Sequence, residues 1–138
     1  MKLLLHNGKL ISESTFNGLN RGMYYGDGFF ETIRFINGNV HLIDIHQKRM
    51  DIAFDELGLN RTASLSRLEL TKSFRKLAAA NELDNGKIRL TIFRKWGGTF
   101  IPESDDCEWI AELSPIKNID FQLNRKGLLI DIYKKEKK

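Results

Sequence analysis

The stretch from Arg21 to Arg34, RGMYYGDGFFETIR, holds the most specific combination of residue types in this chain. Three glycines and four aromatic residues fall within it, and glycine tolerates positive φ angles and close backbone approach. From Phe30 onwards the residues favour a β-strand. The pattern therefore predicts a loop that enters a strand and presents aromatic side chains such as Tyr25 and Phe30. A Gly-x-Gly element is too common to indicate a phosphate site by itself, so an ordinary loop is the competing interpretation.

A second group of chemically useful residues is the HQKRM segment around Arg49. Helical spacing places Arg49 at the edge of an apolar stripe that includes Met50, where an arginine needs an anionic partner. That partner can be a carboxylate such as Glu31, or a phosphate, which a planar guanidinium binds well. His46 is predicted to be a core or supporting residue. No metal site is expected, because His41 lies on a different predicted element and the two histidines are poorly placed to share an ion.

Together, RGMYYGDGFFETIRF and the following INGNVHLIDIHQKRM resemble the start of the class IV pyridoxal-phosphate enzymes, the family of branched-chain and D-amino-acid aminotransferases and aminodeoxychorismate lyase. Both segments match in order and spacing, within residues 20–57. Further along, KIRLTIFRKWGG resembles the strand and turn that follow in this family. The resemblance implies the small N-terminal domain of a fold-type IV enzyme. Such an enzyme uses pyridoxal 5'-phosphate on an amino-acid-like substrate, as an aminotransferase or a lyase.

The resemblance also implies roles for individual residues. Arg49, in the family's His-x-x-Arg-apolar signature, is expected to contact the cofactor phosphate. Phe30 stands where the family places an aromatic residue that faces the substrate, and Tyr25 is the nearest phenol. Arg94 and Thr99, in and beside the turn of the later matching segment, are the other candidates for substrate binding. We therefore expect Arg49 to bind the cofactor and the remaining four residues to bind the substrate.

Two departures from the family narrow the expected activity. D-amino-acid aminotransferases carry an arginine and a histidine near the positions of Thr99 and Ile101, and these two residues bind the substrate carboxylate. Thr99 and Ile101 cannot bind a carboxylate in a comparable way. A preference for an L-amino acid or aminodeoxychorismate over D-alanine is therefore predicted. Aminodeoxychorismate lyases have small residues in the turn where Lys95 and Trp96 stand in this chain. Branched-chain or other aminotransfer is left open.

The family's catalytic lysine, which holds the cofactor as a Schiff base in a Lys-x-x-Asn-Tyr segment, has no counterpart in this sequence. The resemblance therefore implies no catalytic residue within this chain and a lysine beyond Lys138. Residues 1–115 are expected to form the small domain, and 116–138 a linker and the first strand of a second domain. The intact enzyme is expected to be a homodimer, and this chain alone to be inactive. The alternative is a non-catalytic module that keeps the fold and binds a small ligand or a protein.

Length and composition favour one soluble globular domain, with 138 residues of which 41% are apolar and 29% charged. No apolar run resembles a membrane span or a signal peptide, so a cytoplasmic location is expected. The single cysteine, Cys107, excludes an internal disulfide and a cysteine-pair metal site. Without the terminal KKEKK, the 22 basic and 18 acidic residues become 18 and 17, so nucleic acid is not an expected partner.

Turn signals and alternating apolar residues outline the strands that must position the candidate residues. Asn7-Gly8 and Asn37-Gly38-Asn39 are hairpin signals, and the four strands that they join are expected to form an antiparallel sheet. The predicted strands are 2–6, 9–12, 29–36, 40–43, 87–94, 108–113 and 127–133.

Two helices are predicted between these strands. The first has Asp44 as its N-cap and ends at Gly58. The second starts after Ser64 or Ser66 and runs to about Asn81 with one buried apolar stripe. The members of that stripe are Leu70, Phe74, Leu77 and Ala78. The class is therefore α+β, an antiparallel sheet covered by two helices on one face.

Overall fold

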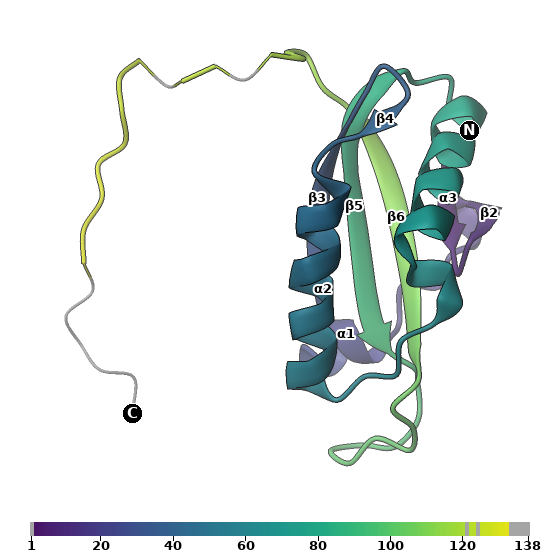
Figure 1. The fold of residues 1–138 in the computed structure, drawn as a ribbon. Coiled ribbons are helices and arrows are strands. Elements are labelled where there is room, and N and C mark those ends of the chain that lie inside the picture. Colours follow the sequence, from purple (N-terminus) through teal and green to yellow (C-terminus); the bar gives the residue numbers. More distant parts are fainter. Residues whose placement is uncertain (1, 121, 124, 133–138) are drawn as a thin grey trace.

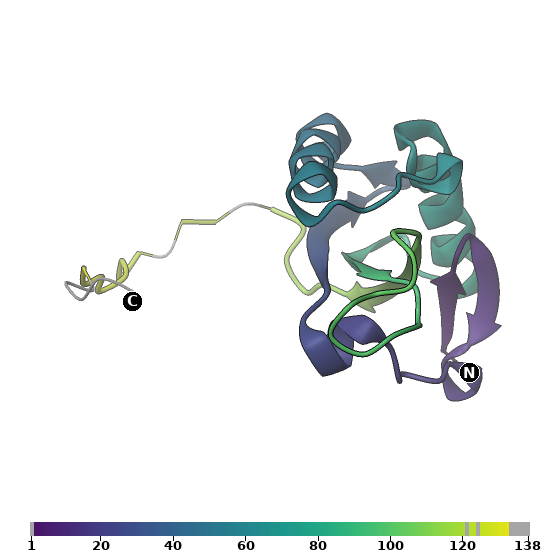
Figure 2. The ribbon, with the colours of Figure 1, turned by 90° about the horizontal axis from the view of Figure 1, so that it is seen from below.

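The computed structural model describes residues 2–120, 122–123 and 125–132. The strands are β1 (Leu3–His6), β2 (Lys9–Ser12), β3 (Gly28–Ile36), β4 (Asn39–Val40), β5 (Asn85–Arg94) and β6 (Cys107–Pro115). The helices are α1 (Arg21–Tyr25), α2 (Ile43–Leu57) and α3 (Arg67–Ala80), with short 3-10 turns η1 (Glu13–Thr15) and η2 (Ala63–Leu65). The six strands form one antiparallel sheet in the order β2-β1-β6-β5-β3-β4. Both long helices lie on the same face of it (Figure 1 and Figure 2), which confirms the predicted α+β class.

Both predicted hairpins are confirmed. Asn7 and Gly8 join β1 to β2 with φ angles of 50° and 84°, and Asn37 and Gly38 join β3 to β4 with 47° and 76°. Positive φ at both central residues is the type I′ geometry, which matches the right-handed twist of paired strands. Local turn chemistry is therefore enough to explain these two connections.

The strand predicted from Val40 to Ile43 is wrong beyond Val40, because α2 already begins at Ile43. Leu42 occupies the N-cap position in a left-handed conformation with φ of 53°. Asp44, the predicted cap, lies inside the first turn and forms an ion pair of 2.8 Å with Arg67. The short β4 matters for the site, because it leaves most of β3 without a neighbour on its outer side.

The four strands of the two hairpins belong to one antiparallel sheet, as predicted, but β5 and β6 lie between the two hairpins. β5 pairs with β3 over residues 85–93 and with β6 over residues 86–94. These long pairings join segments that are distant in the sequence, which the local patterns did not reveal. Six strands occur among the described residues, where about seven were predicted. The strand predicted at 127–133 is not seen at residues 127–132, and Tyr133 lies outside the described residues.

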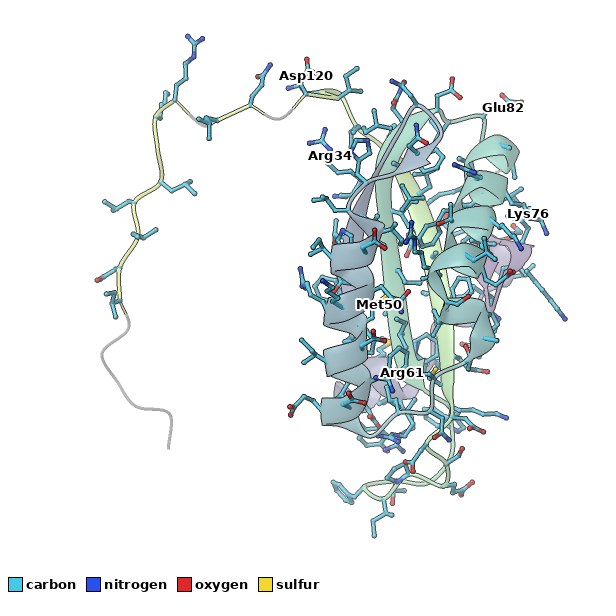
Figure 3. All side chains as sticks on the ribbon, in the orientation of Figure 1. Arg34, Met50, Arg61, Lys76, Glu82 and Asp120 are labelled. Atoms are coloured by element: carbon cyan, nitrogen blue, oxygen red, sulfur yellow. The ribbon has the colours of Figure 1, made fainter. Side chains whose placement is uncertain are left out.

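The hydrophobic core lies between the sheet and the two long helices. Alternation along β5 places Ile88, Leu90 and Ile92 under the helices, and all three are fully buried. Met50 projects from α2 into the same space, whereas Lys76 of α3 points outward (Figure 3). The predicted stripe of α3 is confirmed, since all its members are buried: Leu70, Phe74, Leu77 and Ala78.

The glycine-rich stretch contains a short helix, α1, where a loop was predicted. Asn20 Oδ1 accepts a hydrogen bond from the Met23 amide at 3.0 Å, and Gly26 ends the helix with φ of 64°. Gly22 packs against Phe93, so α1 lies on the sheet face that the long helices leave uncovered (Figure 2). A helix of about one turn leaves too short an apolar repeat to be recognised in the sequence, so this element was missed.

After β6 the chain passes Arg34 of β3, whose Nη2 donates to the carbonyl oxygens of Asn118 and Ile119 at 3.0 and 2.8 Å. From there the described residues up to 132 run away from the sheet (Figure 1). Leu128, Leu129 and other apolar side chains of this segment are exposed. No helix among the described residues is both long enough and apolar enough to cross a membrane.

Candidate active site

Strand β3 has an open outer edge along most of its length. β4 pairs only with Phe35 and Ile36, and no other strand of the described residues lies beside β3 on that side. Side chains of β3 alternate across the sheet, so Glu31 lies under α2 at 3% exposure, while Phe30 is 51% exposed on the opposite face. Two chemically different surfaces therefore meet at one sheet edge. Arg49 belongs to the first surface and Phe30 to the second.

The surface on the helix side is built from Glu31, His46 and Arg49. Glu31 Oε2 lies 2.6 Å from His46 Nδ1, and Glu31 Oε1 lies 3.3 Å from Arg49 Nε. The contact with His46 is a hydrogen bond, and the contact with Arg49 is an ion pair. The carboxylate partner that the sequence suggested for Arg49 is therefore present. His46 supports this carboxylate, and no group of three or more potential metal ligands occurs in the described part of the chain.

The Arg49 guanidinium is held on one side only. Its side chain is 65% exposed, whereas the Glu31 side chain is 4% exposed. Within the described residues, no ion pair or hydrogen bond engages the two terminal nitrogens of Arg49. The buried carboxylate of Glu31 thus anchors Nε, and the two terminal nitrogens of Arg49 are available to an anion from outside the domain.

On the uncovered face, Arg89 of β5 lies over the Phe30 ring, with 3.8 Å between its guanidinium carbon and the ring centroid. Arg89 is also directly opposite Thr32 in the pairing of β3 with β5. A pocket of about 230 Å³ opens here, lined by the glycines of the 20–28 stretch and by β3 and β5. Gly28 belongs to this lining, and an added Cβ would lie only 2.4 Å from the Ile92 carbonyl oxygen. The surface combines an aromatic face, a cation and close backbone approach.

Arg89 was missed by sequence reasoning. The alternation of Ile88, Arg89 and Leu90 predicts that its side chain leaves the core, and this is observed. Its position over Phe30 depends on the pairing of two strands about sixty residues apart, for which the sequence carries no local signal.

Arg94, a predicted substrate residue, has its guanidinium inside the domain at the end of β5. The side chain is 8% exposed, with Nε 3.0 Å from Asp27 Oδ2 and Nη1 2.5 Å from Asp105 Oδ1. Nη2 donates to the Leu57 carbonyl oxygen at 2.7 Å. All three nitrogens therefore have partners within the domain. A substrate anion would have to compete with them.

Tyr25 and Thr99, the other two predicted substrate residues, are brought together by Arg21. The Arg21 guanidinium carbon lies 4.7 Å from the centroid of the Tyr25 ring, and Nη1 donates to the Thr99 carbonyl oxygen at 3.0 Å. Both Tyr25 and Thr99 are exposed. The structure thus groups Tyr25, Thr99 and Arg94 at the end of the sheet where β5 finishes. Arg49 lies apart from them, over the helix side of β3.

The only cysteine is unsuited to nucleophilic chemistry. Burial raises the pKa of the Cys107 thiol to about 11, and its Sγ donates to the Asn60 carbonyl oxygen at 3.4 Å. A thiol with this pKa stays protonated near neutral pH. The other shifted groups lie on the surface: a hydrogen bond to Glu13 raises the pKa of Lys2, and a hydrogen bond from Asn60 lowers the pKa of Asp106. None of these groups contacts Arg49 or Phe30.

The family model and the curated relatives that this chain matches point to the same family. A family model described as amino-transferase class IV matches residues 28–134. The chain is 31% identical over 96 residues to D-alanine aminotransferase of Staphylococcus aureus (strain N315), which covers 68% of this chain and 33% of that protein. It is 30% identical over 88 residues to aminodeoxychorismate lyase of Bacillus subtilis (strain 168), covering 62% of this chain and 29% of that protein. The chain therefore spans about a third of the length of these curated relatives.

Solved structures show the same fold. Branched-chain amino acid aminotransferase from Escherichia coli superposes with a TM-score of 0.68 at 22% identity, over 83% of this chain and 41% of that chain. 4-Amino-4-deoxychorismate lyase from Pseudomonas aeruginosa gives a TM-score of 0.65 at 24% identity, over 82% of this chain and 40% of that chain. These likenesses establish the shared architecture of the domain.

Proposed function

Since this chain belongs to the class IV aminotransferase family, we propose that it forms the small N-terminal domain of a pyridoxal-phosphate-dependent aminotransferase or aminodeoxychorismate lyase. The substrate would be an amino acid or an amino-acid-like compound. The observation that carries this proposal is the anchored but outwardly unpaired guanidinium of Arg49 at the open edge of β3.

Arg49 fits the phosphate group of the cofactor. Glu31 already holds Nε at 3.3 Å, so the side chain loses less conformational freedom when an anion binds. The two terminal nitrogens can then donate charge-assisted hydrogen bonds to phosphate oxygens. His46, fixed to the other oxygen of Glu31, keeps the carboxylate turned toward the helix. Arg49 is therefore the proposed cofactor-binding residue of this chain.

When bound, pyridoxal phosphate supplies the electron sink that allows a proton to be removed from the α-carbon of an amino acid. The residues of this chain would bind and orient the substrate. Phe30 offers an apolar face, and Arg89 above it offers an exposed cation suited to a carboxylate. Tyr25 and Thr99 offer exposed side chains near the end of β5, and we retain them as proposed substrate contacts. Arg94 would join them only by releasing Asp105, which is its more exposed partner at 64%.

The proposal also concerns parts of the intact protein that this structure does not contain. We propose that residues 1–115 are the small domain and that 116–138 lead into a second domain, which supplies the lysine of the family's Lys-x-x-Asn-Tyr segment. We further propose that the intact protein is a cytoplasmic homodimer. No residue of this chain is proposed to be catalytic.

The experiment is to measure the affinity of the intact protein for pyridoxal phosphate by equilibrium dialysis, in the wild type and in Arg49→Ala and Arg49→Lys. The alanine variant should lose roughly 1.5 to 3 kcal/mol per missing bond, and the lysine variant less, since it keeps the charge. Arg67→Ala is the control, because Arg67 is an equally exposed arginine that pairs with Asp44 outside the site. Equal affinity in wild type and Arg49→Ala would refute the assignment. A wild type that binds no cofactor would favour the non-catalytic module instead.

A further inference from the structure

Arg21 is a buried cation that the proposed function does not use. It is 2% exposed, and its Nε lies 3.0 Å from Asp27 Oδ2. Its Nη1 points at three consecutive carbonyl oxygens, those of Gly97, Gly98 and Thr99, at 2.9, 3.2 and 3.0 Å. These carbonyls belong to the loop of residues 95–106 between β5 and β6. A single side chain of α1 therefore holds a turn that is about seventy-five residues further along the chain.

The turn has a backbone shape that depends on such a partner. Gly97 and Gly98 have φ angles of 144° and 69°, which residues with a side chain rarely adopt. This shape directs neighbouring carbonyl oxygens to the same side, where they repel one another unless a donor lies between them. A buried guanidinium supplies that donor with a full positive charge. Without it, the three carbonyl oxygens would lose the charged donor that they share.

The same ion-pair cluster holds the other end of the 95–106 loop. Asp27 Oδ2 is shared, since Arg94 Nε also lies 3.0 Å from it. Arg94 Nη1 in turn contacts Asp105, and the Lys95 amide donates to the Asp106 carbonyl oxygen at 2.8 Å. The four charged side chains carry two positive and two negative charges, so the cluster is balanced. The loop is thus fastened at both ends to the glycine-rich stretch that borders the Phe30 pocket.

We propose that Arg21 is a positioning residue, which fixes the 95–106 loop beside the substrate surface and so sets substrate affinity. The inference rests on the proposed function, because the loop carries the candidate substrate residue Thr99. Lysine cannot replace it, since one ammonium group cannot reach Asp27 and three carbonyl oxygens together.

The first test needs no enzymatic activity. Amide hydrogen exchange is measured on this chain in the wild type, Arg21→Gln and Arg21→Lys. Loop amides from 95 to 106 should exchange about tenfold faster or more in Arg21→Gln, and by an intermediate factor in Arg21→Lys, while the β3 and β5 amides stay protected. Arg75→Gln is the matched control, because Arg75 is an exposed arginine that donates to one turn carbonyl only, that of Gly38, at 3.0 Å. Unchanged loop exchange in a folded Arg21→Gln chain would overturn the proposal.

A measurement on the wild type covers the case in which the variants do not fold. The Nε proton of Arg21 should give a resolved, slowly exchanging NMR signal, because it is buried against Asp27. The Nε proton of Arg75 should exchange with water much faster, because this residue is exposed although its Nε donates to the Gly38 carbonyl oxygen. A rapidly exchanging Arg21 signal contradicts the proposal.

The second test separates positioning from general stability. In the intact protein, Arg21→Lys should raise KM for the amino-acid substrate about threefold or more, with kcat and cofactor affinity nearly unchanged. A loss of kcat with an unchanged KM would contradict a positioning role. If the wild type has no activity on any amino donor, the proposed function fails, while the exchange experiment still decides whether Arg21 holds the loop.

Discussion

Glu31 faces His46 and the cationic Arg49 of α2 from within the covered face of the sheet. A carboxylate with 4% side-chain exposure would be costly to bury alone, and His46 and Arg49 offset that cost. The arrangement is asymmetric, because Arg49 remains 65% exposed. Glu31 therefore acts as an internal anchor for a cation that presents its outer nitrogens to the open edge of β3.

Removing the charge of this anchor should weaken the domain and loosen Arg49. We expect Glu31→Gln to lower the free energy of unfolding by about 1 to 3 kcal/mol, because His46 and Arg49 lose their charged partner. Urea denaturation of this chain measures the change. Glu69→Gln is the control, since its ion pair with Lys72 is exposed at 46% and 61% and should contribute less than about 0.5 kcal/mol. A similar loss of unfolding free energy in both variants would show that the Glu31 cluster stabilises the domain no more than an exposed ion pair does.

At the scale of elements, the crossing of the glycine-rich stretch over β5 requires a residue without a side chain. A Cβ on Gly28 would lie 2.4 Å from the Ile92 carbonyl oxygen and 2.9 Å from the Phe93 Cα. Both are backbone atoms, which cannot move aside as a flexible side chain could. The sheet can accept an alanine there only by displacing β3 from β5.

Gly28→Ala should therefore reduce the free energy of unfolding by about 1 to 3 kcal/mol through overpacking. Gly18→Ala is the matched control, because nothing lies within 4 Å of its added Cβ and its φ is not positive. The control should change stability by less than about 0.5 kcal/mol. The measurement is the thermal unfolding of both variants. Equal melting temperatures would mean that β3 and β5 accommodate the added Cβ at position 28 without a loss of stability.

The start of α2 is strained in a way that substitution can relieve. Leu42 is 65% exposed and has a φ of 53°, a left-handed conformation that costs a residue with a Cβ about 1 to 2 kcal/mol. Leu42→Gly removes that cost, but glycine loses more backbone entropy on folding, which offsets part of the gain. The free energy of unfolding is therefore expected to rise by about 0.5 to 1 kcal/mol. Leu68→Gly, at a leucine of 63% exposure within α3, should instead destabilise by about 1 kcal/mol. Chemical denaturation should show opposite signs, and a loss in both would count against the strain.

For the whole molecule, the prediction of substrate choice rests on Thr99 and Ile101. Thr99 offers one weak hydroxyl and Ile101 none, so a carboxylate trap of the D-amino-acid type is missing from this loop. The relatives named D-alanine aminotransferase share about 31% of the aligned residues, which leaves room for such a difference. We therefore expect the intact enzyme to prefer an L-amino acid or aminodeoxychorismate over D-alanine.

The measurement is a turnover panel on the intact protein with L-leucine, L-glutamate, D-alanine and aminodeoxychorismate at equal concentration. Arg89→Gln serves as the companion variant, and should raise KM for the preferred substrate if the cation above Phe30 binds its carboxylate. D-alanine as the best substrate would contradict the prediction, because its carboxylate would then be bound without the arginine and histidine of the D-amino-acid aminotransferases.

The sequence by itself determined the features that depend on local interactions. Asn-Gly turns predicted two hairpins, apolar periodicity predicted the two long helices and the buried stripe of α3, and the motif around Arg49 pointed to the family. It also suggested Glu31 as a partner for Arg49, since a lone cation at the edge of an apolar stripe needs a carboxylate. The turn and periodicity signals are readable because each lies within a few residues of the chain.

Only the tertiary structure decided which distant segments meet. It placed β5 and β6 between the hairpins, set Arg89 over Phe30, and gave Arg21 and Arg94 a shared partner in Asp27. It also ended β4 at Val40, which leaves the outer edge of β3 open beside Arg49. Strand register and buried ion pairs arise from minimising exposed apolar area and unpaired charge over the whole chain, so no local pattern carries them.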